Sequence, residues 1–216
     1  MNIIIIGPQG SGKGTQAELL ANEFSLEHID MGKYLREAAL LNTPLGKKIN
    51  EIINVKKELV GDKILEKVIH LKLVELPREQ GIVFDGVPRS QSQLDYLEKT
   101  IREVGREINK VIFIKLSEKE SIKRISNRRV CSQCKSVYIL GKDKEANSGV
   151  CSKCGGKVVQ RIDDTPEGIR KRLKIFKTET MPVVEYYRRQ GKMIEINGDQ
   201  TIKKVFEDIK TRIKTN

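Results

Sequence analysis

Short runs of apolar residues alternate along the chain with longer stretches in which apolar residues recur every three or four positions. The short runs predict buried strands at 2–6, 26–29, 81–86, 110–116 and 193–197. The longer stretches predict helices at 13–24, 31–41, 62–76, 90–103, 118–128 and 201–214. Strands that alternate with helices are typical of a parallel sheet covered on both faces, so the pattern predicts the α/β class.

Two further helices are predicted from the residues at their starts. Thr43-Pro44 has the residue types preferred at the N-cap and first position of a helix, which we expect to continue over 44–54. The stretch 164–167 has a similar pattern and begins a long helix that reaches residue 190. Proline removes a backbone donor, so we expect a kink near Pro182.

The length of 216 residues permits one large core with inserted lobes. The segments 30–60 and 129–162 contain no core strand, so we expect both to project from the sheet. No apolar stretch approaches the roughly 20 residues of a membrane-spanning helix. The first residues also lack the basic segment of a signal peptide, so we expect no membrane contact and a cytoplasmic location.

The net charge of +12 indicates polyanionic partners, either nucleotide phosphates or nucleic acid. For most of the lysines a solvated surface is the better interpretation. The two histidines, His28 and His70, stand in unrelated surroundings and are interpreted as structural. The sequence has no evident Ser-His-Asp or Cys-His arrangement, so it does not favour nucleophilic catalysis.

The first strand leads directly into a glycine-rich loop, Gly7 to Thr15 with the sequence GPQGSGKGT, and then into a helix. Glycines allow backbone N–H groups to converge on an anion, and the start of a helix adds unpaired N–H groups. Lys13 adds a mobile positive charge. Gly14 follows Lys13 where the general P-loop pattern has a hydroxyl, which comes one position later at Thr15. The stretch predicts a phosphate-binding loop without the usual magnesium-binding hydroxyl.

Asp85 ends a buried strand, and ligands of open α/β sheets bind at the carboxyl ends of strands. Beside a phosphate-binding loop, this carboxylate is interpreted as a Mg²⁺ ligand, directly or through water, rather than as a cap of the next turn. Phosphoryl transfer also needs positive side chains that neutralise spread negative charge. Arginines that could supply them are Arg36, Arg89, Arg124, Arg128, Arg129, Arg161, Arg170 and Arg172.

All four cysteines occur in two C-x-x-C pairs, Cys131 with Cys134 and Cys151 with Cys154, separated by sixteen residues. This spacing is typical of a zinc ribbon with a closed tetrahedral S₄ site, which is structural because no coordination position stays open. Iron could occupy the same ligands.

These motifs, in this order, resemble the adenylate kinases of the long, zinc-bearing bacterial type over nearly the whole chain. The resemblance is carried by the phosphate loop with its shifted hydroxyl, by Gly32-x-x-Leu35-Arg36, by Asp85-Gly86-Val87-Pro88-Arg89, by Arg128-Arg129, and by Arg161-x-Asp163-Asp164.

The resemblance implies a three-layer P-loop kinase core with a parallel five-stranded sheet, formed by 1–29, 61–126 and 165–216. It also implies a helical AMP-binding lobe at 30–60 and a small zinc-ribbon β LID at 127–164 that folds over ATP.

The resemblance further implies roles for individual residues. The ATP site would comprise Gly10, Ser11, Gly12, Lys13, Gly14, Thr15, Arg124, Arg128 and Tyr138. The AMP site would comprise Met31, Arg36, Val60, Gly86, Arg89, Gln93, Arg161 and Arg172. In these sites Arg124 would stack on the ATP base, and Gln93 would read the adenine edge with its amide. The catalytic set would be Lys13, Asp85, Arg89, Arg128, Arg161 and Arg172.

Three positions depart from the family pattern. Met31 stands where threonine or serine is usual, Lys33 replaces an aspartate that lies near the magnesium-bound waters, and Val87 replaces a phenylalanine. Met31 removes a hydroxyl from the AMP side, and Lys33 exchanges a negative charge for a positive one. We therefore expect these positions to affect monophosphate selectivity and Mg²⁺ binding.

The implied reaction is reversible in-line transfer of the γ-phosphoryl group from MgATP to AMP, giving two ADP, as the LID and the AMP lobe close. Mg²⁺ and one structural Zn²⁺ would be the cofactors, and the protein would act as a monomer. One alternative is a kinase for another nucleoside monophosphate, which Met31 keeps open. The other is a P-loop protein whose ribbon binds nucleic acid. Tyr138 is the only aromatic residue of the cysteine segment, so the segment has few side chains on which nucleic-acid bases could stack.

Overall fold

In the computed structural model, which describes residues 1–55, 60–161 and 164–215, five parallel strands form the central sheet. Their order is β2-β3-β1-β4-β8. The strands span Glu27–Asp30, Ile82–Asp85, Asn2–Ile6, Lys110–Lys115 and Met193–Asn197, in that order. The predicted α/β class and the parallel five-stranded sheet are confirmed.

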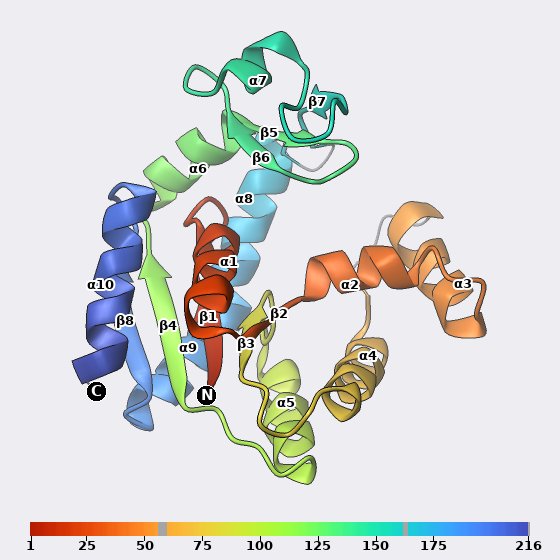
Figure 1. Cartoon of the computed structure of the whole chain (residues 1–216), viewed down its shortest axis with the longest axis vertical. Helices are drawn as coiled ribbons and strands as arrows, with labels where there is room; N and C mark the ends of the chain where they lie inside the picture. Colours follow the sequence, from red (N-terminus) through yellow and green to blue (C-terminus); the bar gives the residue numbers. More distant parts are fainter. Residues whose placement is uncertain (56–59, 162–163, 216) are drawn as a thin grey trace.

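Strand β1 lies at the centre of the sheet, and every residue in it is buried. Its run of isoleucines suits a strand covered on both faces. Alternate side chains of β1 enter two separate clusters. Ile3 and Ile5 pack with residues of α1 (Lys13–Phe24) and α10 (Ile202–Thr215). Ile4 and Ile6 pack with residues of α4 (Asp62–Glu75), α5 (Gln91–Glu103) and α9 (Met181–Arg189). The core therefore has three layers, helix, sheet and helix (Figure 1).

The first insertion follows β2 and is helical, as predicted. It contains α2 (Met31–Ala38), α3 (Pro44–Asn50) and a π-helical segment over Glu51–Val55, and it projects away from the sheet (Figure 1). Thr43 Oγ1 accepts a hydrogen bond from Gly46 N–H, which confirms the predicted N-cap of α3. The predicted helix over 31–41 was too long, because the backbone tightens after Ala38 into a turn in which Leu40 N–H bonds to Glu37 O.

Polar contacts tie the base of this insertion to the core. Tyr34 of α2 donates a 2.9 Å hydrogen bond to Glu27 of β2, and Lys72 of α4 lies 5.2 Å from the centre of the Tyr34 ring. Lys72 Nζ also lies 3.9 Å from Glu27 and 3.6 Å from Glu75. Burial and the hydrogen bond to Glu27 raise the pKa of Tyr34, so its hydroxyl stays a donor. These contacts fix where α2 leaves the sheet.

The second insertion follows α6 (Glu118–Ser126) and forms a small antiparallel sheet with strand order β6-β5-β7. It contains β5 (Arg128–Cys131), β6 (Val137–Ile139), β7 (Val158–Val159) and the short helix α7 (Lys144–Ser148), at the top of Figure 1. The predicted helix over 118–128 was wrong at its end. Arg128 pairs with Ile139 in the small sheet, so α6 stops at Ser126.

The long helix predicted after residue 164 is present but interrupted. Thr165 caps α8 (Pro166–Ile175), which runs through a π-helical segment at Phe176–Thr180 into α9. The wider turn lies directly before Pro182, which lacks the N–H that an α-helical hydrogen bond would need. The irregularity predicted near Pro182 is thus a π-helical turn. Among the described residues, no helix is long and apolar enough to cross a membrane.

Candidate active site

The loop between β1 and α1 has the backbone of an anion-binding site. Gly12, at the N-cap of α1, has φ of 87°, and Gly10 has φ of 82°, a region that side-chain-bearing residues rarely adopt. A Cβ on Gly7 would lie 2.5 Å from Ser11 Oγ and 2.9 Å from Ile114 O, so the loop packs too closely for any larger residue there. Lys13 is the first residue of α1, where unpaired N–H groups and the helix dipole favour an anion.

Asp85 ends β3 beside this loop. A Cβ on Gly14 would lie 3.2 Å from Asp85 Oδ2, so the carboxylate lies against the start of α1 and leaves little room for a side chain at position 14. Asp85 is 7% exposed, and its Oδ1 atom is buried without a hydrogen-bond partner among the described residues. A buried carboxylate oxygen without a partner costs free energy unless a cation or water satisfies it. The position therefore fits Mg²⁺, alone or through bound water.

The charges around Asp85 hold it ionised. Burial alone would raise its pKa, but His28, Lys13 and Arg89 together lower it below the usual value. Nε2 of His28 lies 3.7 Å from Asp85 Oδ2, a distance too long for a hydrogen bond. Burial lowers the pKa of Lys13, and the opposite charge of Asp85 counteracts it.

Two of the arginines predicted to contact phosphate bind the same acid. Arg128 and Arg172 both bind Asp164, which is 1% exposed: Arg128 Nη2 lies 2.6 Å and Arg172 Nη2 2.8 Å from the same Oδ1 atom. Burial raises the pKa of Asp164, but hydrogen bonds from the two arginines outweigh it and keep the pKa below its usual value. Asp164 thus joins β5 of the second insertion to α8 of the core.

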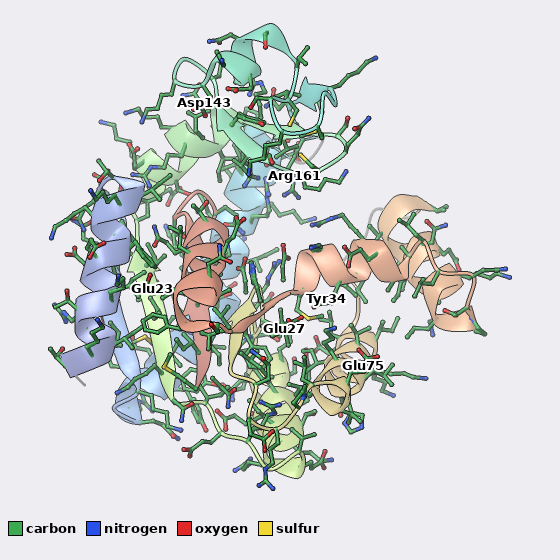
Figure 2. The ribbon with its side chains drawn as sticks, viewed as in Figure 1. Glu23, Glu27, Tyr34, Glu75, Asp143 and Arg161 are labelled. Carbon is green, nitrogen blue, oxygen red and sulfur yellow. The ribbon has the colours of Figure 1, made fainter. Side chains whose placement is uncertain are left out.

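Arg161 and Arg172 are close enough to Arg89 for their charges to repel it. Arg161 lies on the side of the small sheet that faces the core (Figure 2). Arg89 itself is exposed, and its Nε donates a 2.7 Å hydrogen bond to Gly86 O. Asp85 and Asp30 counteract this repulsion at Arg89. Several positive side chains gathered in one place are typical of a site for a polyanion.

The guanidinium group of Arg124 donates hydrogen bonds to three acceptors. Its Nε donates to Glu120 at 2.9 Å, its Nη1 to Gly198 O at 2.9 Å and its Nη2 to Asp199 at 3.2 Å. Hydrogen bonds within the plane leave the faces of the guanidinium free to stack on an aromatic ring. Stacking of Arg124 on the ATP base stays a prediction.

The residues predicted on the AMP side differ in exposure. Arg36 is exposed, whereas Met31, Val60 and Val87 are buried in one apolar cluster. Lys33 is also exposed, and its Nζ lies 3.9 Å from Glu37 on the surface of α2. Both side chains are exposed, so this contact changes the charge at position 33 little.

The four cysteines come together at one point of the second insertion. Their sulfurs all lie within 4.8 Å of one another, with Cys131 Sγ 3.4 Å from Cys154 Sγ and Cys134 Sγ 3.5 Å from Cys151 Sγ. Tetrahedral zinc with bonds near 2.3 Å would space sulfurs about 3.8 Å apart, so the cluster fits such an ion closely.

Hydrogen bonding by Ser136 lowers the pKa of the Cys134 thiol to about 6. A backbone hydrogen bond at Gly156 lowers the pKa of Cys154, but the thiols of Cys134 and Cys131 raise it further, to about 11. A bound cation would hold all four as thiolates.

Tyr138, predicted at the ATP site, is 8% exposed and packs in the cluster around the cysteines, where its hydroxyl lies 3.1 Å from Cys151 Sγ.

Three further polar residues, Asp164, His28 and Asp30, are recognised as neighbours of the site only in the folded structure. Asp164 belongs to the motif Arg161-x-Asp163-Asp164, in which the sequence indicates no individual role for it. Asp163 lies outside the described residues. His28 was interpreted as structural. Asp30 pairs in register with Asp85 across β2 and β3, and the position of both acids at strand ends was the signal that could have found it.

A phosphate-binding loop, a buried carboxylate beside it and converging arginines, all at one end of a parallel sheet, define a P-loop phosphotransferase. A family model described as adenylate kinase matches residues 5–192. The adenylate kinases of Petrotoga mobilis and Archaeoglobus fulgidus are 40% and 38% identical, over 97% of this chain and 95% and 96% of their own. That of Dehalococcoides mccartyi is 40% identical over 99% of this chain and 98% of its own. The chain belongs to the adenylate kinase family.

Proposed function

We propose that the protein transfers the γ-phosphoryl group of MgATP to AMP, reversibly and by direct in-line attack, giving two ADP. The observation that carries this proposal is the glycine loop, which brings the start of α1 and Lys13 within reach of the charges of Asp85 and Arg89. Phosphoryl transfer leaves the protein little covalent chemistry, so positioned positive charge is its main requirement.

Each group then has a defined task. Amides of the loop and Lys13 would hold the outer phosphates of ATP, and Arg36 and Arg89 would bind the AMP phosphate. Arg128, Arg161 and Arg172 would neutralise charge on the transferring group. The attacking oxygen of AMP is already anionic at neutral pH, so no general base is required. Asp85 would hold Mg²⁺, which supplies electrostatic stabilisation of the phosphate oxygens when bound.

The proposal includes a division of the chain into moving parts. Residues 30–60 would form the AMP-binding lobe and 127–164 the LID, with the remainder as the core. Water competes with AMP as the acceptor, so closure over both nucleotides would suppress ATP hydrolysis. Asp164, held by arginines on both sides of the LID boundary, lies at the hinge of that movement.

Zinc is the ion proposed for the four cysteines, because a closed S₄ set is typical of structural zinc. Thiols that hold a metal instead of forming disulfides are typical of reducing compartments, which supports a cytoplasmic location. A monomer is proposed because lobes that swing need free space. Nucleic-acid binding by the ribbon is less favoured, since Tyr138 is buried and cannot stack on a base.

Product stoichiometry tests the proposal directly. ATP and AMP are mixed with Mg²⁺ and the protein, and all nucleotides and inorganic phosphate are quantified over time. We expect two ADP for each AMP consumed and no phosphate release. Release of phosphate independent of AMP would instead identify an ATPase.

A further inference from the structure

The side chain of Gln93, predicted to read the base of AMP, is held from two sides. Gln93 is the third residue of α5, and its Oε1 accepts a 2.9 Å hydrogen bond from Arg89 N–H. Its Nε2 donates a 3.1 Å hydrogen bond to Asp62 Oδ1, from the first residue of α4. Two helices that are distant in sequence thus meet at one amide.

The chemistry of the two partners fixes which end of the amide is which. A backbone N–H can only donate and a carboxylate can only accept, so Oε1 must face Arg89 and Nε2 must face Asp62. Each end retains one further capacity, a lone pair on Oε1 and an N–H on Nε2. Because they belong to one amide group, they can serve a ligand together as an acceptor and a donor.

An adjacent acceptor and donor complement one kind of purine edge. A 6-aminopurine presents a donor at N6 and an acceptor at N1, which pair with Oε1 and Nε2 respectively. A 6-oxopurine presents the reverse, an acceptor at O6 and a donor at N1. To read that edge the amide would have to turn over, and its NH₂ would then face Arg89 N–H while its oxygen faced the Asp62 carboxylate. The fixed amide therefore selects adenine.

Asp62 is itself held in place. Ser92 Oγ donates a 2.5 Å hydrogen bond to Asp62 Oδ2, and Ser90 Oγ accepts from Gln93 N–H at 3.3 Å. We propose that Asp62 is a specificity-determining positioning residue that fixes the Gln93 amide in the order required by a 6-aminopurine monophosphate. The proposal rests on the proposed function, since it assumes that AMP is the acceptor and that Gln93 faces its base.

The test compares AMP with inosine monophosphate, which differs at the 6-position and N1 alone. The ratio of kcat/KM for the two acceptors is measured with MgATP for the wild type and for Asp62→Ala, Asp62→Ser and Asp62→Asn. We expect Asp62→Ala and Asp62→Ser to lower the ratio about tenfold or more, because only Arg89 N–H then opposes turning the amide over. Asp62→Asn keeps an acceptor for Nε2 and should retain the ratio within about twofold.

A double-mutant cycle separates positioning from a general structural effect. In a Gln93→Ala background, Asp62→Ala should leave the ratio unchanged, because Asp62 acts only through Gln93. Asp62→Ser serves where Asp62→Ala fails to fold, since serine is well tolerated at a helix start but too short to reach Gln93.

An unchanged ratio in both disrupting variants, or an equal loss in the Gln93→Ala background, would overturn the inference. In that case the wild type would still prefer AMP. A wild type without AMP-dependent ADP formation would instead overturn the proposed function itself.

Discussion

At the residue scale, the proposed phosphoryl transfer depends on charged side chains that are in place before any nucleotide binds. Lys13 and Asp85 influence each other across the loop, while Arg161 and Arg172 act on Arg89. Groups fixed in advance need little reorganisation when charge develops in the transition state, which is why they stabilise it strongly. Replacing one of these charged residues should therefore change the rate or the stability by a measurable amount.

Replacing Lys13 with alanine removes the mobile positive charge at the start of α1. We expect the rate constant of phosphoryl transfer to fall about 10²- to 10³-fold, as when one preorganised donor to a transition state is lost. Steady-state turnover with saturating MgATP and AMP measures the effect. Lys99→Ala is the matched control, because Lys99 is a 68% exposed lysine of α5. Near-normal turnover of Lys13→Ala would contradict the mechanism.

Replacing Asp164 with asparagine removes the charge shared by Arg128 and Arg172. Because the arginines lower the pKa of Asp164 in the folded protein, the ionised carboxylate contributes stability at any pH above its usual value of 3.8. That contribution is lost as the pH falls below 3.8 towards the depressed pKa. We expect Asp164→Asn to lower the free energy of unfolding by about 1.5–3 kcal/mol at neutral pH.

Urea unfolding from about pH 7 down to about pH 3 measures this difference. The difference in the free energy of unfolding between wild type and Asp164→Asn should become smaller as the pH falls. Asp199→Asn removes an acid that also pairs with an arginine but is 66% exposed, and it should cost little. A gap that stays constant over the range would show that the charge of Asp164 is not responsible.

At the element scale, the second insertion has few apolar residues to hold it together. Its buried cluster consists of Cys131, Tyr138, Ala146, Cys151 and Val158, and two of these are metal ligands in the proposal. A core of that size does not stabilise a small domain alone, so a bound metal would supply the remainder.

Removal of the metal by a chelator should therefore act locally. We expect faster amide hydrogen exchange in β5, β6 and β7 and a lower Tm, while the central sheet stays protected. Cys134→Ser, which removes one ligand, should reproduce the effect without chelator. Identical melting and exchange before and after chelation would contradict a structural metal.

Elements also show how far the sequence could predict the structure. The five strands of the central sheet and the starts of α3 and α8 followed from apolar runs and caps, because these signals are local. The two insertions followed from the lack of core strands in 30–60 and 129–162, and the positions of β5, β6 and β7 were not predicted. The end of α6 did not, since Arg128 leaves the helix to pair with Ile139 further along the chain. The contact of Gln93 with Asp62 likewise depends on two helices that meet only in the folded core.

At the scale of the whole molecule, the proposed site combines residues of three parts. In the proposal the core would contribute Lys13 and Asp85, the first insertion Arg36, and the second Arg128 and Arg161. Figure 1 shows both insertions on the side of the sheet to which the phosphate loop leads. A site divided in this way would be complete only when the parts approach one another, which would link nucleotide binding to the proposed closure.

The central claim is that AMP is the acceptor, and a panel of acceptors tests it most directly. Initial rates of ADP formation from MgATP are measured with AMP, CMP, UMP, GMP or no acceptor. We predict that kcat/KM for AMP exceeds that for each other monophosphate by about 100-fold or more, with negligible turnover when no acceptor is present. Equal or higher kcat/KM for another monophosphate, or equal turnover without any acceptor, would contradict the account.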